Sequence, residues 1–282
     1  MRPTFIVIGA EKAATTSICA QLEQHPDVFV TDPKEPGFFS AHYDRGWGWY
    51  ERLFDGAGEC RAAGEGTVRY SQATLYPGVP ERIASDLPDV RLIYVTRHPL
   101  DRVESMWIQW RSMGHEGASD DFCRSLQESP GMLDASRYWF QISAYRERFA
   151  DEQILVLFFE EYRRDPAATL RRCFEHIGVD PDAPIPDLEA RNESVGKLVD
   201  GPVAGVLRRV PLMSRVRDAM PLAIRDGVRR ALKKPVQGRP VWDESTRLWA
   251  IERVAEDCAR FLEHYGKPAD YWNLGATPES AR

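Results

Sequence analysis

The sequence predicts an α/β fold, and two observations carry the prediction. Short apolar runs rich in β-branched and aromatic residues, typical of buried strands, alternate along the chain with segments typical of helices. The first run, Phe5–Ile8, passes through a turn of small residues directly into a helical segment. With 282 residues, of which 43% are hydrophobic, the chain is long enough to bury a full core around a parallel sheet.

The stretch from Phe5 to Thr16 reads Phe-Ile-Val-Ile-Gly-Ala-Glu-Lys-Ala-Ala-Thr-Thr and organises the rest of the chain. A buried strand, a tight turn and a helix N-terminus together form an anion cradle. The first-turn N–H groups have no partner within the helix, and the helix dipole adds partial positive charge. Lys12 in the turn can reach a phosphate or sulfate oxygen, and Thr15 adds a hydroxyl next to that of Thr16.

This loop is not a Walker A motif, which needs Gly-x-x-x-x-Gly-Lys followed directly by Ser or Thr. Here Lys12 precedes two alanines, and the second glycine is missing. From the loop alone, an ordinary β–α turn with a solvated lysine remains an open alternative.

Composition limits the classes of function. The net charge of −6 excludes a general polyanion binder, so any anion site must be local, and we expect no nucleic-acid partner. The five cysteines stand singly, which argues against a disulfide framework or a cysteine metal site and favours a reducing cytoplasm. We expect no signal peptide and no membrane span, because the first strand begins within a few residues of the N-terminus and no apolar run approaches about 20 residues.

The next informative stretch is Lys-Glu-Pro-Gly-Phe-Phe, which begins at Lys34. If Phe38 and Phe39 pack inward, Glu35 is expected to be partly desolvated, a setting that can tune a carboxylate as a general base. The alternative is a surface Lys–Glu pair beside a hydrophobic turn.

Residues 46–54 are dense in aromatic side chains. Their spacing predicts a helix whose core face carries Trp49, Leu53 and Phe54. One of the rings could also line an acceptor pocket.

Residues 64–71 are expected to form a strand that ends in a polar loop, with Arg69 and Ser71 as weak candidates for a cleft. A helix is predicted over Pro80–Leu87.

The clearest interior strand covers residues 90–96 and leads into Arg97. Open α/β sheets bind ligands at the carboxyl ends of their strands, where the planar fork of Arg97 suits a phosphate. A helix that begins near Leu100 places Asp101 and Ser105 on one side, so Ser105 can donate to the same group. The alternative is an Arg97–Asp101 pair with a solvated serine.

The remaining elements follow from the same patterns. Residues 111–137 are expected to form a mobile loop and a short helix, placed as a lid or acceptor contact. A helix is predicted over Tyr138–Phe149, a strand over Ile154–Phe159, a helix over Ala167–Ile177 and a closing helix over Ser245–Tyr265.

Residues 196–234 change character and become basic. After Asp200 this stretch has two acids and nine basic residues: Arg208, Arg209, Arg215, Arg217, Arg225, Arg229, Arg230, Lys233 and Lys234. Prolines divide it into short predicted helices with one solvated basic face, although such a segment can also bind a membrane surface or an anionic partner. A Gly-Arg loop follows, whose backbone could wrap a phosphate.

The order of these motifs resembles the sulfotransferases that use 3′-phosphoadenosine-5′-phosphosulfate (PAPS). It is most similar to the branch that contains the heparan sulfate N- and 3-O-sulfotransferase domains. The likeness rests on Lys-x-x-Thr-Thr, Lys-Glu-x-x-Phe-Phe, Gly-x-x-Trp-Tyr, Arg-x-Pro-x-x-Arg-x-x-Ser and Gly-Arg, over roughly residues 4–178 and 233–272. It implies a P-loop-like, mostly parallel sheet flanked by helices. It also implies a single domain over residues 1–282, with residues 196–234 as a basic helical insert.

The resemblance also implies roles for individual residues. Lys12 would hold the 5′-phosphosulfate and stabilise the leaving oxygen, and Glu35 would take the proton of the acceptor. Arg97 and Ser105 would bind the 3′-phosphate. The remaining contacts to the nucleotide would come from Glu11, Ala13, Ala14, Thr15, Thr16, Gly238 and Arg239.

The expected cosubstrate is therefore PAPS, with 3′,5′-ADP as product and no metal, and the acceptor is a small molecule or glycan. Two departures from the branch stand out: Gly37 replaces a polar residue, for which His42 or Arg69 could compensate, and Gln237 replaces a lysine.

Two other hypotheses about the function remain. One is a P-loop-type kinase, ranked second because the strand before Arg97 does not end in an aspartate for Mg²⁺. The other is a non-catalytic module that binds anions or membranes through the basic stretch.

Overall fold

The structure, a computed structural model, describes residues 1–187, 198–200, 233–235 and 240–275. It divides into two compact units. The described part of the first unit comprises residues 1–102, 133–187 and 248–275, and that of the second comprises residues 103–132, 198–200, 233–235 and 240–247. Most of the predicted basic insert lies outside the described residues, and a single domain over residues 1–282 stays a prediction.

The first unit contains a five-stranded sheet in the order β2-β3-β1-β4-β5, and every neighbouring pair is parallel. Its strands are β1 (Phe5–Gly9), β2 (Val28–Val30), β3 (Ala62–Gly66), β4 (Arg91–Thr96) and β5 (Ile154–Phe158). Apart from the exposed Arg91 at the start of β4, nearly all strand residues are buried, as a parallel sheet covered on both faces requires. The predicted α/β fold with a mostly parallel sheet is confirmed.

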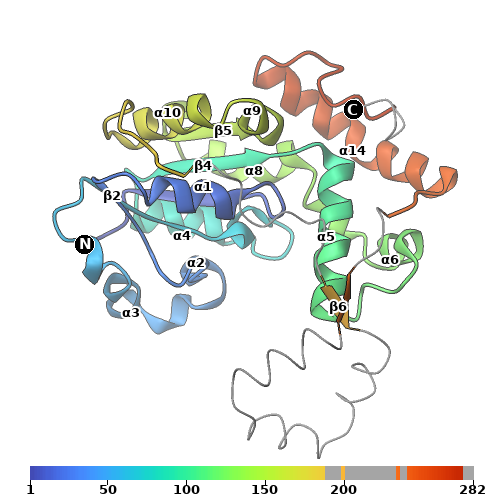
Figure 1. The fold of residues 1–282 in the computed structure, drawn as a ribbon, viewed down its shortest axis with the longest axis horizontal. Coiled ribbons are helices and arrows are strands. Elements are labelled where there is room, and N and C mark those ends of the chain that lie inside the picture. The colour runs from blue at the N-terminus through green and yellow to red at the C-terminus, as the bar shows by residue number, and fades with distance from the viewer. Residues whose placement is uncertain (188–197, 201–232, 236–239, 276–282) are drawn as a thin grey trace, which may run out of the picture. The chain divides into compact units, whose positions relative to one another are not determined.

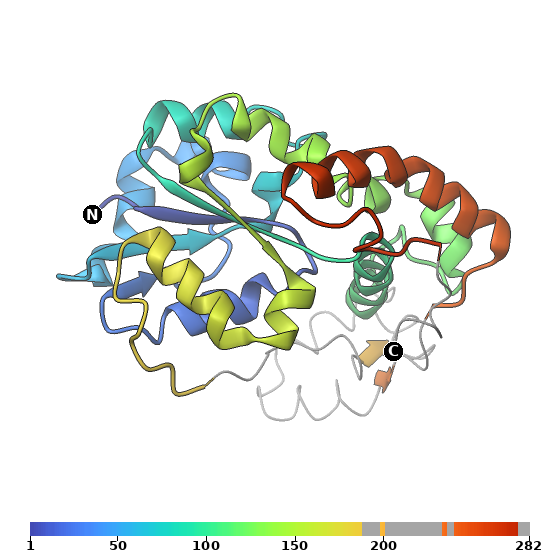
Figure 2. The same cartoon turned by 90° about the horizontal axis from the view of Figure 1, so that it is seen from above.

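Helices cover both faces of this sheet (Figures 1 and 2). Helices α1, α9 and α10 lie on one face, and α4 and α8 lie on the other. The α-helices of this unit are α1 (Thr15–Leu22), α2 (Phe38–Ala41), α3 (Trp47–Arg52), α4 (Val79–Asp86), α8 (Tyr138–Arg146), α9 (Phe159–Arg164) and α10 (Pro166–Ile177). Short 3₁₀ helices are η1 (Tyr43–Arg45), η2 (Asp55–Ala57), η3 (Val68–Ser71) and η4 (Asp151–Gln153). Helix α14 (Glu244–His264) lies in this unit from Leu248 onward.

The strand order creates a switch point beside β1. From β1 the chain runs to β2 and β3 on one side, and then crosses to β4 and β5 on the other. The loops after β1 and β4 therefore leave the same edge of the sheet next to each other, where open α/β sheets bind their ligands. At the end of β1, Gly9 has φ +152°, and a Cβ there would overlap the Ser71 hydroxyl, so the position needs glycine.

Most helix ends match the predicted ones because their caps are encoded locally. Asp165 accepts a hydrogen bond from the Ala168 N–H over 2.9 Å at the start of α10, and Gly178 ends this helix with φ +82°. Helix α8 is shorter than predicted, since it ends at Arg146.

The aromatic stretch packs differently from the prediction. Tyr50 and Phe54 are the buried residues, whereas Trp49 and Leu53 are only half-buried. Helix α3 ends at Arg52, so the chain beyond it does not continue the predicted helical face. Tyr50 stacks on Phe38 with ring centroids 4.3 Å apart and an interplanar angle of 8°.

The second unit begins within α5 (Pro99–Met113) and contains α6 (Phe122–Glu128) and a two-stranded antiparallel sheet of β6 (Leu198–Asp200) and β7 (Lys233–Pro235). Helix α7 (Gly131–Asp134) spans the boundary to the first unit. Residues 111–137, predicted as a mobile loop with a short helix, contain the end of α5 and the helices α6 and α7, and the connection between α5 and α6 is residues 114–121.

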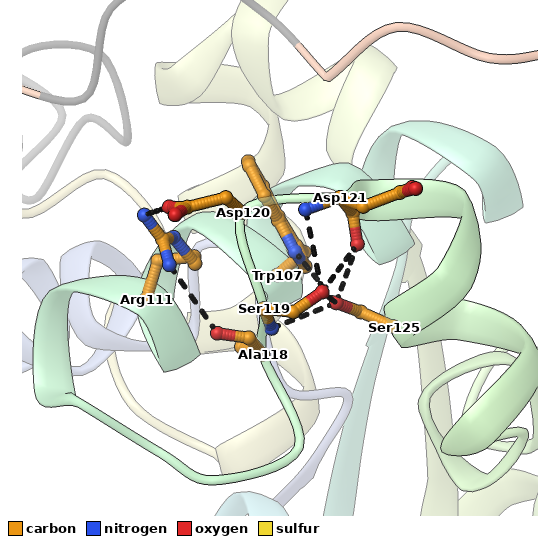
Figure 3. Close-up of polar contacts among 7 residues, drawn as sticks. All are labelled: Trp107, Arg111, Ala118, Ser119, Asp120, Asp121 and Ser125. Carbon is orange, nitrogen blue, oxygen red and sulfur yellow. Dashed lines mark hydrogen bonds and ion pairs between the residues drawn. The ribbon is translucent and has the colours of Figure 1, made fainter.

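Hydrogen bonds close this connection (Figure 3). The buried Ser125 hydroxyl accepts from the Trp107 indole N–H over 3.3 Å and from the Ser119 N–H over 2.9 Å. It donates to the Asp121 carbonyl over 2.7 Å. An ion pair between Arg111 of α5 and the exposed Asp120 also joins the helix to this connection. Residues 114–121 are thus held by specific contacts.

Among the residues that the structure describes, no helix has both the length and the apolar character that crossing a bilayer demands.

Candidate anion-binding and catalytic site

The loop between β1 and α1 has an unusual backbone. Lys12 (φ +70°) and Ala14 (φ +66°) both adopt the left-handed conformation, which residues with a Cβ rarely occupy. Such residues, next to right-handed ones, turn successive N–H groups toward one side and form an anion-binding concavity. Ala14 is the N-cap of α1, and no side chain caps this helix end. The geometry is that of a cradle for an anion.

The predicted cradle residues differ in how they face this loop. The Ala13 N–H donates to the Ala10 carbonyl over 3.2 Å and so closes the turn. The carboxylate of Glu11 accepts from the Gln72 side chain over 3.1 Å, so only its backbone amide suits an anion. Thr15 is buried and Thr16 is half-buried.

Arg97, at the end of β4, reaches the loop that follows β1. Its Nη1 donates to the Lys12 carbonyl over 3.3 Å, and its guanidinium lies 4.7 Å from the centroid of the Phe159 ring. The structure thus brings two predicted binding residues together at the carboxyl edge of neighbouring strands.

Tyr138, which sequence reasoning missed as a functional residue, fixes the backbone of Arg97. Its hydroxyl donates to the Arg97 carbonyl over 2.6 Å and accepts from the Arg97 N–H over 3.3 Å. Burial raises the pKa of Tyr138, so the hydroxyl keeps its proton and its role as donor. The sequence offered only an apolar helical position as a signal for this residue.

Arg102 is a second residue to which no role was assigned, although it belongs to the Arg-x-Pro-x-x-Arg motif. Its side chain is fully buried, and its Nε donates to the Ser136 hydroxyl over 2.6 Å. That hydroxyl donates in turn to the Pro99 carbonyl over 3.1 Å. Burial lowers the pKa of Arg102, and the charge of Glu11 opposes the shift. Arg102 therefore anchors the start of α5.

Glu160 holds the residue after Arg97. Its Oε1 accepts from the His98 N–H over 2.7 Å, and burial raises the pKa of this carboxyl. Glu160 lies just after β5, so three neighbouring strand ends contribute to this edge.

The predicted base, Glu35, also has a left-handed backbone, with φ +65°. Phe38 and Phe39 are fully buried as expected, but the Glu35 side chain is 40% exposed and pairs with Lys34 over 3.0 Å. Glu35 is thus partly exposed and paired with Lys34, which matches the alternative of a surface Lys–Glu pair beside a hydrophobic turn.

Glu35 follows Lys34 in the loop after β2, and this loop lies beside α1: a Cβ built on Gly66 would lie 2.6 Å from the Cys19 sulfur and 3.7 Å from Cε of Lys34. Burial raises the pKa of the Cys19 thiol in α1 to about 12, and the charges of Lys34 and Glu35 both act on this thiol. The loop after β2 therefore lies beside the helix that begins at the cradle.

Three further residues are predicted to contact the nucleotide: Ser105, Gly238 and Arg239. Ser105 is buried on α5 and belongs to the second unit, whereas Arg97 belongs to the first. Gly238 and Arg239 lie outside the described residues, as does Gln237. The contacts of these residues with the nucleotide stay predictions.

Two residues were named as possible replacements for a polar side chain at position 37. Gly37 has φ +65°, and a Cβ on it would lie 3.9 Å from Cδ2 of His42. His42 thus occupies the space beside Gly37. Arg69 is exposed, and the hydroxyl of the buried Ser71 donates to the Val68 carbonyl over 3.2 Å.

Within the described part of the chain, no group of three or more His, Cys, Asp or Glu side chains is arranged to hold a metal ion.

Comparison with known proteins gives one family and several relatives. The family model described as "Sulfotransferase domain" matches residues 2–200. Heparan sulfate glucosamine 3-O-sulfotransferase 3A1 from Mus musculus is 30% identical over 184 residues, which are 63% of this chain and 46% of the relative. The human 3B1 enzyme is 29% identical over the same length. The chain thus spans about half the length of the curated relatives that it matches.

Among solved structures, a sulfotransferase from Alicyclobacillus acidocaldarius superposes with a TM-score of 0.68 at 25% identity. The match covers 97% of this chain and 99% of that one.

Proposed function

Because the chain belongs to the sulfotransferase-domain family, we propose that it transfers a sulfuryl group from PAPS to a hydroxyl or amine of a small-molecule or glycan acceptor. One observation carries the proposal: the hydrogen bond from Arg97 to the Lys12 carbonyl joins a phosphate-binding side chain to an anion cradle. A nucleotide with two separated anionic groups needs such a pair of neighbouring sites.

The described residues fit this nucleotide. The left-handed residues Lys12 and Ala14 and the N-terminus of α1, which no side chain caps, suit the oxygens of a 5′-phosphosulfate. The planar guanidinium of Arg97, fixed through Tyr138, suits a 3′-phosphate. When bound, PAPS supplies the activated sulfuryl group.

The protein's own residues then have distinct tasks. Lys12 and the loop amides stabilise the negative charge that develops on the phosphate oxygen as its bond to sulfur breaks. Glu35 accepts the proton of the acceptor as the new bond to sulfur forms. Its exposed position beside α1 lets an acceptor approach from solvent. We also assign Ser105, Gly238 and Arg239 to the nucleotide, as the motif resemblance implies.

The acceptor side of the site is marked by aromatic and basic groups near Gly37. The Arg45 guanidinium lies 4.1 Å from the centroid of the half-buried Trp49 ring, and the His42 ring packs edge-on against Trp49. Such a platform suits a sugar or another ring-bearing molecule. The names of the relatives describe transfer to an oxygen of glucosamine, which favours a hydroxyl as the accepting group. A cytoplasmic location stays a prediction.

Calorimetry tests the proposal. Wild-type protein should bind 3′,5′-ADP without metal and more tightly than ATP with Mg²⁺. Lys12→Ala should lose most of this binding, whereas Arg124→Ala, an exposed cation paired with Glu128, should keep it. Incubation with radiolabelled PAPS and a panel of alcohols, amines and glycans should transfer label to an acceptor.

Preference for ATP with Mg²⁺ would replace the proposal with the kinase hypothesis. Liposome binding that survives Lys12→Ala, without any nucleotide binding, would support the anion or membrane module instead.

A further inference from the structure

Glu65 is a fully buried carboxyl in β3 that the proposed chemistry does not use. Three hydroxyl groups donate to it. Thr67 reaches Oε2 over 2.6 Å, and Tyr70 and Tyr50 reach Oε1 over 2.7 and 3.1 Å. The three donors come from two elements and a loop. A buried polar group without a hydrogen-bond partner costs stability, so the carboxyl and the three hydroxyls hold one another in place.

Two of these hydroxyls connect Glu65 to the chain just after Glu35. The Gly37 N–H donates to the Thr67 hydroxyl over 3.2 Å, and the Phe39 N–H donates to the Tyr70 hydroxyl over 3.2 Å. A single hydroxyl thus hydrogen-bonds both the Glu65 carboxyl and the backbone amide in each case.

The direction of these hydrogen bonds depends on Glu65. A hydroxyl can present a lone pair to a backbone N–H when its own proton is donated elsewhere. The Glu65 carboxyl accepts a hydrogen bond from each of the Thr67 and Tyr70 hydroxyls, so that their lone pairs face the two amides. An apolar residue at position 65 would leave both hydroxyls free to rotate away.

The third hydroxyl, that of Tyr50, provides an internal contrast. It donates to the same Glu65 oxygen as Tyr70, but its link to the loop is the stacking of its ring on Phe38. Its hydroxyl therefore stabilises the buried Glu65 carboxyl, but its contact with residues 37–39 is ring packing and not a hydrogen bond.

We propose that Glu65 is a positioning residue for Glu35: through Thr67 and Tyr70 it holds the backbone of residues 37–39, and thereby keeps Glu35 in its left-handed conformation beside the cradle. This inference rests on the proposed function, because it assigns Glu65 to the base of that reaction. Glu35 precedes Gly37, whose N–H is one of the two amides held through these hydroxyls, by two positions in the chain.

Paired substitutions separate positioning from simple structural support. Thr67→Val removes the hydroxyl and keeps the shape, and Thr67→Ser restores the hydroxyl. Tyr70→Phe cuts the second path, and Tyr50→Phe removes a hydroxyl that donates to Glu65 without leading to an amide. Each variant is assayed for kcat, for KM of PAPS, for the Kd of 3′,5′-ADP and for thermal unfolding.

We expect Thr67→Val and Tyr70→Phe to lower kcat on the order of 10-fold to 100-fold, since small misplacements of a reacting group have effects of this size. The Kd of 3′,5′-ADP should stay within about twofold, because the cradle itself is untouched. Thr67→Ser should recover most of kcat, and Tyr50→Phe should keep it even where it lowers the unfolding temperature.

A fall in kcat that follows the loss of stability in all variants, Tyr50→Phe included, would overturn the inference. Equal kcat for Thr67→Val and Thr67→Ser would do so as well. Failure of the proposed function gives a different result, namely no 3′,5′-ADP binding and no transfer by the wild-type protein.

Discussion

The Arg97 guanidinium and the Lys12 carbonyl are joined by a 3.3 Å hydrogen bond, although 85 positions separate the two residues in the chain. The contact crosses from the end of β4 to the loop after β1. The two predicted halves of the nucleotide site therefore lie side by side, with the Arg97 side chain on the 3′-phosphate half.

Substitution of Arg97 should therefore weaken binding at the 3′-phosphate most strongly. We expect Arg97→Ala to raise the Kd of 3′,5′-ADP on the order of 10-fold to 100-fold, as lost charge-assisted hydrogen bonds do. Arg97→Lys should recover only part of this affinity, because a lysine lacks the planar fork. Titration calorimetry measures both.

The same titration with 5′-AMP, which lacks the 3′-phosphate, is the control. Its Kd should change little in Arg97→Ala. If the affinity for 5′-AMP falls as much as that for 3′,5′-ADP, Arg97 acts by holding the Lys12 loop rather than by binding the 3′-phosphate.

The left-handed backbone of Ala14 gives a prediction about stability. Ala14→Gly should keep nucleotide affinity, because glycine adopts this conformation without strain. Ala14→Val should lower the free energy of unfolding by about 1–3 kcal/mol, because a β-branched residue is strained there. Chemical denaturation of both variants checks this. Equal stability of the two would mean that the backbone at Ala14 leaves the left-handed region in solution.

Loss of the proposed base should separate turnover from binding. Glu35→Gln should bind 3′,5′-ADP like wild type and lose kcat by a factor on the order of 10²–10⁴, because a positioned base contributes that much. Glu23→Gln is the matched control, an exposed carboxyl at the end of α1, and it should keep kcat. Normal turnover of Glu35→Gln would remove Glu35 from its assigned role.

Much of the fold could be predicted because its signals are local. The strand of Phe5–Gly9, the N-cap Asp165 and the terminal Gly178 mark their elements within a few residues. Residue type and position after an apolar strand predict that the loops after β1 and β4 belong to the site.

The functional residues that the sequence did not reveal depend on contacts with residues distant in the chain. Glu65, Tyr138 and Glu160 act through partners that only the tertiary fold brings to them, and their residue types look ordinary in a strand or helix. The sequence predicts partial desolvation of Glu35 if its aromatic neighbours pack inward, but the side chain is 40% exposed. The turn of the chain at Gly37, set by φ +65°, separates it from them, and no periodicity in the sequence signals that turn.

The buried carboxyl of Glu65 should make stability depend on pH. Burial raises its pKa from 4.5 to about 7, against the hydrogen bonds of the three hydroxyls. In the unfolded chain Glu65 releases its proton near pH 4.5, whereas the folded protein keeps it up to about pH 7. The folded state binds more protons in this window, so its stability falls as pH rises through it.

Glu65→Gln cannot titrate, so it isolates this contribution. Relative to the variant, wild type should lose on the order of 3 kcal/mol of unfolding free energy between about pH 4.5 and pH 8, at about 1.4 kcal/mol per pKa unit. Urea unfolding of both proteins across this range measures the difference. The charged and titratable groups that interact with Glu65 are shared by both proteins: Cys19, Glu35, Tyr50, Tyr70 and Tyr145. A difference that stays constant with pH would contradict the raised pKa.

The closed connection between α5 and α6 should depend on a single hydroxyl. Ser125→Ala leaves the Trp107 indole N–H and the Ser119 N–H without their acceptor (Figure 3), which should lower the free energy of unfolding by about 1–3 kcal/mol. Asp120→Asn weakens an ion pair whose carboxylate is 90% exposed, and should change that free energy by less than about 0.5 kcal/mol. Hydrogen exchange of the Trp107 indole, followed by NMR, should accelerate in Ser125→Ala alone. Equal exchange in both variants would show that residues 114–121 are held by the packing of their neighbours and not by Ser125.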